Sequence, residues 1–454
     1  MKLLRLSRVF LFAVPAFTIW ACQKNKSGEI GAPVIETVQT SVQGRVLDQH
    51  LLPLKGATVV CGGKTTTTSV NGTFLLEKVS VNKDAAVVIV SKNQYLTGIR
   101  TLIVNENDLH YVQIMLHERE VAATFSGANG GIVSLPYGKL TIPPNAVLLK
   151  DSTLYNGIVD VNFRYLNPAD DHFADLMAGD LRGITWENIQ KGLWSYGMFT
   201  LELSGQNGEI LHLDNNNPTT LQIVIPGPLQ GSAPAQIPLW FFNITSGYWE
   251  EKGTATKQGD TYIATIKSTG FWHYAVPYDL VSLRTTIIDQ HNAPVPNMQV
   301  TILRKLDFIP VYSYTDAAGR FTGKVPVNAQ LIFTLTDPCR DIFYHQETGP
   351  FAAASSINAL TITLPSDNTL MIDGIANNCA NEPVQGGIVN MLVDGLYYKA
   401  AVTKGHFKST ILRCNSSSTD VVLTATDTTA SISTMTTINA NNGIITPTLV
   451  VCTP

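Results

Sequence analysis

Charged side chains are scarce in this sequence. They make up 15% of its 454 residues, whereas an average globular protein has about 25%. The 31 Lys and Arg residues against 35 Asp and Glu residues leave a net charge of -4, which provides no basic surface for a nucleic acid. Long helical patterns are absent as well, while Thr, Val, Asn and Gly are plentiful. The composition therefore argues against a nucleic-acid partner and favours short β-strands joined by turns.

The common enzyme signatures are also missing. The chain has no phosphate-binding G-x-x-x-x-G-K-[ST] loop, no G-x-G-x-x-G after a strand and no H-E-x-x-H motif. The G-x-S-x-G motif of a nucleophile elbow is absent around Ser195. Gly192 lies one residue before the position that this motif requires. His117 and Glu120 are three residues apart and would face opposite sides of a strand, which argues against a zinc site. We therefore expect no enzyme activity, no cofactor and no metal site.

Two segments rich in oxygen ligands remain. They are residues 170–172 (Asp-Asp-His) with Asp175, and residues 214–217 (Asp-Asn-Asn-Asn). Calcium needs six or more oxygen ligands in an ordered spacing. Neither segment matches the D-x-[DN]-x-[DN]-G pattern of a calcium-binding loop. Both segments predict solvated loops, although calcium binding by a loop stays open. A hydrolase acting through Asp171 and His172 is the most distant functional alternative.

Long apolar runs are absent after residue 22, so no later segment is expected to span a bilayer as a helix. Lys2, Arg5 and Arg8 precede a short apolar stretch, which is typical of a signal peptide in residues 1–22. Residues 19–22 (Ile-Trp-Ala-Cys) resemble the lipobox of bacterial lipoproteins. This resemblance implies cleavage before Cys22 and lipid attachment there, with residues 23–39 as a tether. The alternative is an ordinary signal peptide with an incidental cysteine.

A repeated pattern is the strongest internal signal. Residues 44–59 and 285–300 both contain Asp-Gln-His, and in both a proline follows the aspartate by five residues. A glycine turn and a phenylalanine come later in each copy, and a weaker third copy begins at Gly374. Proline turns, alternating strands and glycine turns are typical of an antiparallel sandwich. The repeat predicts three equivalent buried positions, at Phe74, Phe321 and Phe407.

The repeated unit resembles the carboxypeptidase regulatory-like domain, a transthyretin-like β-sandwich. The resemblance covers residues 40–118 and 281–365, and less closely a third, divergent sandwich in residues 366–454. Residues 119–280 differ and resemble the β-rich ZU-type domains of netrin receptors and ankyrins, and part of cartilage intermediate layer protein. The predicted fold class is therefore all-β, with a string of sandwich domains (transthyretin- or Ig-like) around a larger central β-rich domain.

The ZU-type resemblance implies a structural or protein-interaction module. Some such domains cleave themselves at a His-Phe-Ser sequence, but residues 268–272 (Ser-Thr-Gly-Phe-Trp) lack that histidine and serine, so self-cleavage is not expected. Aromatic side chains of this domain are the best candidates for binding, because exposed aromatics stack on sugars or anchor proteins. The candidates are Trp186, Trp194 and Tyr196, whereas Trp240 and Trp272 lie in apolar strands and are expected in the core.

Together these patterns predict a non-catalytic, lipid-anchored protein of the bacterial cell envelope. Its β-sandwich modules would bind an envelope protein or glycan of unknown identity. The alternative is a carbohydrate-binding accessory lipoprotein that captures polysaccharide. Gln23 after the lipidated cysteine favours the outer membrane, and the face of that membrane stays open.

The cysteines predict two disulfides. With Cys22 lipidated, five cysteines remain, and the cell envelope is oxidising enough for disulfides to form. Cys61 lies within a strand without a partner nearby in the sequence, so we expect it to be free and buried. The other four allow three connectivities. Counting alternating strands in the second and third copies favours the pairs Cys379–Cys452 and Cys339–Cys414.

Overall fold

The computed structural model describes residues 35–305, 309–414 and 416–452, and its regular structure is almost entirely β. Helical structure in these ranges is limited to α1 (Phe173–Leu176) and the 3-10 turn η1 (Gly227–Leu229). Neither helix has the length and apolar character needed to cross a bilayer. The predicted all-β class is confirmed. The predicted signal peptide and the lipidation site Cys22 lie outside the described residues.

The first sandwich, residues 37–115, packs two sheets face to face, in the orders β4-β1-β7 and β3-β2-β5-β6. Alternation decides which side chains enter its core, because successive residues of a strand face opposite sides. In β5, Ala86, Val88 and Val90 point inward and are fully buried. The strands are β1 (Thr37–Leu47), β2 (Thr58–Cys61), β3 (Lys64–Thr67), β4 (Thr73–Asn82), β5 (Ala86–Ser91), β6 (Gly98–Leu102) and β7 (Leu109–Met115).

The second sandwich, residues 280–362, has the same two-sheet plan, in the orders β24-β21-β27 and β23-β22-β25-β26. Its last strand is interrupted, so both β27 and β28 run parallel to β21. The strands are β21 (Leu280–Asp289), β22 (Gln299–Arg304), β23 (Val311–Tyr314), β24 (Arg320–Pro326), β25 (Leu331–Thr336), β26 (Ile342–Thr348), β27 (Ser355–Ser356) and β28 (Leu360–Ile362).

The third module, residues 369–451, differs because its eight strands form one continuous sheet. The tight β31–β32 hairpin, paired at Thr403 and His406, connects what are separate sheets in the two sandwiches. The strands are β29 (Thr369–Asn378), β30 (Gly386–Val393), β31 (Leu396–Thr403), β32 (His406–Leu412), β33 (Thr419–Asp427), β34 (Ile432–Ala440), β35 (Gly443–Ile445) and β36 (Thr448–Val451).

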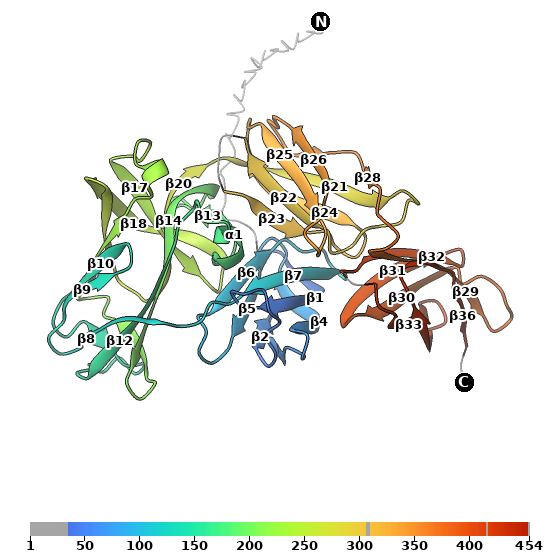
Figure 1. Cartoon of the computed structure of the whole chain (residues 1–454), viewed down its shortest axis with the longest axis horizontal. Coiled ribbons are helices and arrows are strands. Elements are labelled where there is room, and N and C mark those ends of the chain that lie inside the picture. The colour runs from blue at the N-terminus through green and yellow to red at the C-terminus, as the bar shows by residue number, and fades with distance from the viewer. Residues whose placement is uncertain (1–34, 306–308, 415, 453–454) are drawn as a thin grey trace, which may run out of the picture.

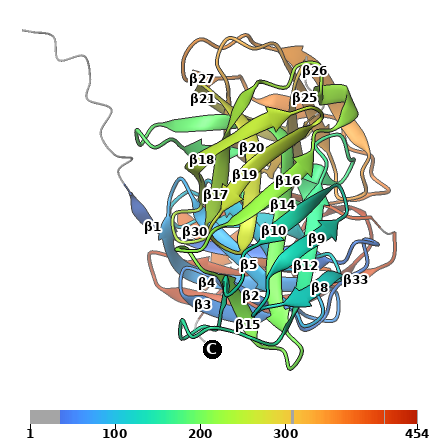
Figure 2. The ribbon, with the colours of Figure 1, turned by 90° about the vertical axis from the view of Figure 1, so that its left-hand side faces the viewer.

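The central domain, residues 121–278, is built on one 13-stranded sheet around its own core. Figure 2 looks onto its long strands, which run side by side. Trp240 and Trp272 are buried there, as predicted. The strands are β8 (Val121–Ser126), β9 (Gly131–Leu135), β10 (Gly138–Ile142), β11 (Val147–Leu148), β12 (Ile158–Leu166), β13 (Arg182–Ile184), β14 (Gln190–Gly205), β15 (Ile210–Leu213), β16 (Thr219–Val224), β17 (Gln236–Asn243), β18 (Tyr248–Gln258), β19 (Thr261–Ile266) and β20 (Gly270–Tyr278).

One turn recurs after the first strand of all three repeated modules. In the second sandwich, Asp289 Oδ1 accepts hydrogen bonds from the backbone N–H groups of His291 and Ala293, both at 2.8 Å. Asn292 between them has a φ of 59°, a conformation that asparagine tolerates. Two further side chains make the same pair of bonds in their own modules, namely Asp48 and Asn378.

The phenylalanine after the glycine turn occupies the same buried position in each copy, as predicted. All three are less than 7% exposed, and the exposed fractions of Phe74, Phe321 and Phe407 are 6%, 3% and 2%. Each lies opposite one position of its module's first strand, and these positions are Gly44, Thr285 and Gly374. A Cβ at Gly44 would lie 2.8 Å from the Phe74 ring, so this ring requires glycine beneath it.

The modules do not follow one another in space as they do in sequence. Figure 1 shows the first sandwich in the middle, with the central domain, the second sandwich and the third module around it. Strand β7 contacts both α1 and β23, and β1 contacts β31. The arrangement is therefore centred on the first sandwich, although the largest domain was expected at the centre of a string.

Polar side chains bind the first sandwich to its neighbours. The amide of Gln43 is 1% exposed and bonds to both backbone groups of Tyr397 in the third module, at 2.5 and 2.7 Å. Arg320 of the second sandwich pairs with Asp316 at 2.9 Å and also with Asp108 of the first. Buried polar groups are costly unless they are paired, so these contacts select one arrangement of the modules.

Both predicted disulfides are present. Cys339 is bonded to Cys414 across the boundary between the second sandwich and the third module, and Cys379 is bonded to Cys452 within the third module. Each pair has a Cα–Cα distance of 5.2 Å, which lies within the usual range for disulfides. Cys61 is buried and is the free cysteine of the described residues, as predicted.

We expect Phe321→Ala to destabilise the second sandwich by about 3–5 kcal/mol, because the substitution leaves a cavity in a closed core. Denaturant unfolding of the full-length protein, followed by circular dichroism, would measure the loss. Ile342→Ala is the matched control, because Ile342 belongs to the same sandwich and is 63% exposed. If Phe321→Ala unfolds like the wild type, the three phenylalanine positions are not equivalent core sites.

We expect the double variant Cys339→Ser/Cys414→Ser to lose up to about 4 kcal/mol of stability, because the disulfide closes a long loop in the unfolded chain. The sequence separation of the pair is 75 residues. Unfolding under non-reducing conditions, combined with peptide mapping, would test this. The variant should retain the Cys379–Cys452 peptide pair as an internal control. A Cys379–Cys414 peptide pair in the wild type, or four free thiols, would contradict the connectivity.

Candidate functional site

A polar pocket of about 530 Å³ lies where the first sandwich meets the central domain, and we call it the junction pocket. Gln49 follows β1 and His117 follows β7, whereas Arg164 belongs to β12 of the central domain. The loop of residues 169–172 before α1 completes the polar wall. Its apolar lining consists of Met115, Leu166, Phe173 and Leu176. The segments around His117 and around residues 170–172 are separate in the sequence and meet in one pocket.

The histidine of the first segment is bonded on both ring nitrogens. His117 Nε2 lies 2.5 Å from Arg164 Nη1, and His117 Nδ1 lies 2.9 Å from the backbone oxygen of Glu118. Because a guanidinium can only donate, Nε2 accepts from Arg164 and Nδ1 donates its proton to the Glu118 oxygen. Burial lowers the pKa of His117, and the charge of Arg164 acts in the same direction. A neutral ring bonded in this way is not available as a base or as a metal ligand.

The second segment holds a histidine–carboxylate pair. His172 Nδ1 lies 3.1 Å from Asp175 Oδ2, and the other Asp175 oxygen accepts a 2.7 Å hydrogen bond from the Tyr312 hydroxyl of the second sandwich. A nucleophilic site would also need a hydroxyl or thiol bonded to the histidine. No such group is bonded to His172 within residues 35–305, 309–414 and 416–452. In those same ranges, no three His, Cys, Asp or Glu side chains gather closely enough to hold a metal ion.

The three aromatic residues predicted to bind a ligand lie in three different environments. Trp186 is 78% exposed at the turn between β13 and β14. Trp194 is half-buried beneath Arg304 of the second sandwich, whose guanidinium carbon is 3.9 Å from the ring centroid. Tyr196 is 5% exposed and donates a 3.0 Å hydrogen bond to the backbone oxygen of Ser232. Tyr196 is therefore a core residue, which corrects its predicted exposure, and Trp186 is the most accessible of the three.

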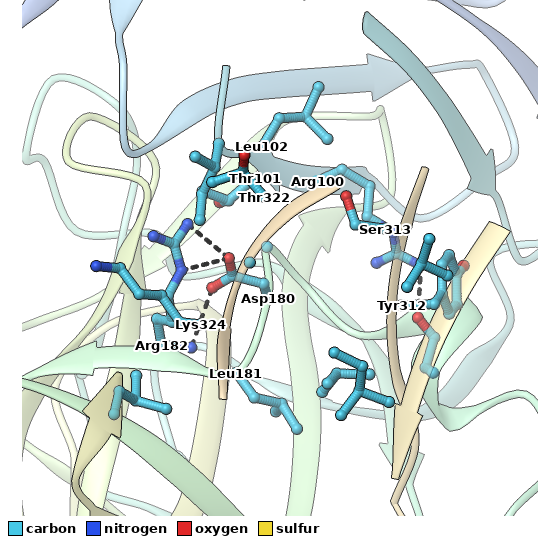
Figure 3. Close-up of a pocket in the computed structure, with 18 of the residues that line it drawn as sticks. Arg100, Thr101, Leu102, Asp180, Leu181, Arg182, Tyr312, Ser313, Thr322 and Lys324 are labelled. Atoms are coloured by element: carbon cyan, nitrogen blue, oxygen red, sulfur yellow. Dashed lines mark hydrogen bonds and ion pairs between the residues drawn. The ribbon is translucent and has the colours of Figure 1, made fainter. Parts of the chain in front are cut away.

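A smaller cavity of about 110 Å³ lies where the first sandwich, the central domain and the second sandwich meet (Figure 3). Arg182 donates to Asp180 through Nε at 2.7 Å and through its backbone N–H at 3.0 Å. Lys324 lies beside this pair in Figure 3 and donates to Ser282 at 2.9 Å. Arg100 enters from the first sandwich and donates to backbone oxygens at the end of α1. We assign this cavity to the domain junction, because each of its charged side chains bonds to the protein, although Nη1 of Arg182 has no hydrogen-bond partner among the described residues.

His273 in β20 directly follows residues 268–272, which correspond to the cleavage sequence of self-cleaving ZU-type domains. It is fully buried, and neither ring nitrogen has a hydrogen-bond partner. The ring packs against Trp249 with a centroid distance of 5.0 Å. Burial lowers the pKa of His273 to about 3. An isolated neutral imidazole cannot pass a proton to a nucleophile, so His273 acts as an apolar core residue.

Comparison with curated proteins finds limited similarity, and no family model matches the chain. Cartilage intermediate layer protein 2 of Mus musculus is 24% identical over 237 residues, covering 48% of this chain and 20% of the mouse protein. The Homo sapiens protein of the same name is 27% identical over 132 residues, covering 28% of this chain and 11% of the human protein. The chain thus spans a fifth or less of these relatives. This similarity agrees with the resemblance to cartilage intermediate layer protein that the sequence indicates. It supports no statement beyond that resemblance.

Solved structures with some similarity include bacterial proteins. The shaft pilin SpaA of Lactobacillus rhamnosus GG has 12% sequence identity and a TM-score of 0.19, and the match covers 38% of this chain and 98% of the pilin. The TIE protein of Bacillus anthracis has 11% identity and a TM-score of 0.19, with 92% of this chain and 68% of that chain covered. TM-scores this low support no argument about a shared role.

We expect the buried histidine to make the central domain sensitive to acid. The unfolded chain binds a proton at His273 below about pH 6.5, whereas the folded protein resists protonation until about pH 3. Stability is therefore lost as the pH falls through this window, by about 2 kcal/mol at pH 5. The variant His273→Phe should lose less stability than the wild type between pH 7 and pH 5 in thermal unfolding.

The control for this experiment is His345→Gln, which removes an exposed ring and should leave the wild-type pH dependence unchanged. Equal pH dependence in His273→Phe and the wild type would show that His273 does not titrate as a buried group.

Proposed function

We propose that this chain is a non-catalytic, lipid-anchored protein of the bacterial outer membrane that presents β-modules to a protein or glycan of the cell envelope. The observation that carries the proposal is the way the modules are joined. The first sandwich is bonded to the third module through Gln43 and to the second sandwich through Asp108. In addition to these polar contacts, the Cys339–Cys414 disulfide joins the second sandwich to the third module. A body joined in this way is suited to holding a binding surface at a constant distance from a membrane.

The lipid anchor is proposed from the N-terminal sequence alone. Lys2, Arg5 and Arg8, the short apolar stretch after them and Cys22 have the order that lipoprotein export requires. Stable attachment generally takes more than one acyl chain, and lipoproteins of this type carry two or three. The outer membrane is proposed because Gln23, rather than an aspartate, follows the cysteine.

A glycan ligand is the second candidate, as in an accessory lipoprotein that captures polysaccharide. Two observations support it: Trp186 is 78% exposed, and the junction pocket presents exposed polar side chains. Hydrolysis is less well supported. His117 is bonded on both nitrogens, and His172 is paired only with Asp175 among the described residues.

The anchor is tested by Cys22→Ala in cells that express the full-length chain. We expect the wild type in the membrane fraction, labelled by an alkyne fatty acid, and the variant uncleaved or released in soluble form. Cys61→Ala is the matched control, because it removes a cysteine without touching the leader and should keep the label. Unlabelled mature wild-type protein in the soluble periplasm would contradict the anchor.

A further inference from the structure

We propose that the junction pocket binds a neutral oligosaccharide, whose hydroxyl groups donate to the carboxylates of Asp170 and Asp171. This inference rests on the proposed function as an envelope-binding protein and names a ligand class and a site for it. The site is distinct from the exposed Trp186 and from the half-buried Trp194.

The dimensions of the pocket fit a small ligand. Its volume of about 530 Å³ lies within the range of roughly 300–1,000 Å³ in which small-molecule sites fall. One wall belongs to the first sandwich and the other to the central domain, and contacts close by hold the two together. Thr97 of the first sandwich donates to Glu202 of the central domain through its backbone N–H and its hydroxyl, both at 3.4 Å. Because the walls are already in place, a ligand would not have to order them on binding.

The charges of the pocket select against simple ions. Asp170 and Asp171 are exposed at the rim, so a free anion would be repelled by two carboxylates. Arg164 is half-buried behind them and already donates to His117. A metal ion would need more closely placed ligands than the described residues offer. Carboxylates accept hydrogen bonds only, so the partner must bring hydrogen-bond donors, as sugar hydroxyl groups do.

The remaining lining fits the rest of a sugar ring. Gln49 can both donate and accept, as a hydroxyl does. Beside the polar wall, Met115 and Leu166 are buried and Leu176 is half-buried. A sugar has hydroxyl groups at its edge and C–H groups on its faces, so it can use both kinds of wall at once. A zwitterion such as an amino acid would need a guanidinium for its carboxylate, and Arg164 already gives one of its N–H groups to His117.

The test uses the full-length mature protein in detergent and a panel of neutral di- and trisaccharides built from glucose, mannose, galactose or xylose. Calorimetry should detect binding of at least one saccharide. Asp171→Asn should weaken it about tenfold by removing a charged acceptor. Ala169→Trp should abolish it by filling the pocket from an exposed loop position. The matched control, Asp214→Asn in the other oxygen-rich turn, should bind like the wild type, and Trp186→Ala is measured beside it to test the β13–β14 turn.

The other outcomes can be told apart, and all but the last overturn the inference. Saccharide binding that survives both pocket variants places the ligand elsewhere, and loss in Trp186→Ala alone places it at the β13–β14 turn. Binding of free amino acids without any saccharide would identify a zwitterion site. If no saccharide binds while Cys22 is lipidated, the sugar site is wrong and the anchored envelope protein stands. If saccharides bind while Cys22 is not lipidated, the site stands and the proposed anchor fails.

Discussion

A single side-chain oxygen determines the path of the chain after the first strand of each repeated module. It accepts two backbone N–H groups that would otherwise lack partners, and the chain can then reverse within a few residues. The reversal brings a proline back to pair with the end of the first strand in all three modules. In the second sandwich the other oxygen of Asp289 accepts a 2.7 Å hydrogen bond from Thr410 of the third module. The same residue therefore orders a turn and a contact between modules.

The first sandwich meets its neighbours through apolar contacts, such as Tyr111 against Tyr314, and through polar contacts that share one physical character. They are hydrogen bonds and ion pairs of side chains that are largely removed from water, such as Gln43 and Asp108. An apolar contact tolerates sliding, whereas a buried amide or carboxylate loses stability as soon as its partner moves. The arrangement of the four modules is therefore specific, and the pockets between them have defined walls.

Local patterns in the sequence were sufficient for the all-β class, the repeat and the disulfides. The equivalence of Phe321 to its counterparts follows from its spacing after a glycine turn, and the pairing of Cys339 follows from strand direction. The third copy was aligned weakly because Asn378 replaces the aspartate that starts the turn, although an amide oxygen accepts the same bonds. These predictions succeeded because each depends on residues within one module or next to its end.

Contacts between modules could not be predicted in this way. His117 and Arg164 are 47 residues apart and meet only because the first sandwich packs against the central domain. Nothing in the sequence around Gln49 or Arg164 marks either residue as part of a pocket. Tyr196 was expected to be exposed because tyrosine is common at binding surfaces, yet a backbone oxygen near Ser232 satisfies its hydroxyl inside the core. The junction pocket is thus a property of the assembled chain.

The two disulfides also determine how the molecule responds to mechanical force. Their loops interleave, because Cys379 lies inside the loop closed by Cys339 and Cys414, and Cys452 lies outside it. A pull between the N-terminal part of the chain and the end of the third module would cross from Cys339 to Cys414 through a covalent bond. The three segments 339–379, 379–414 and 414–452 would then share the load in parallel, so the stretch from residue 339 to residue 452 could extend only as far as the shortest of them. Such interleaved cross-links would limit how far this part of the chain can be stretched under tension.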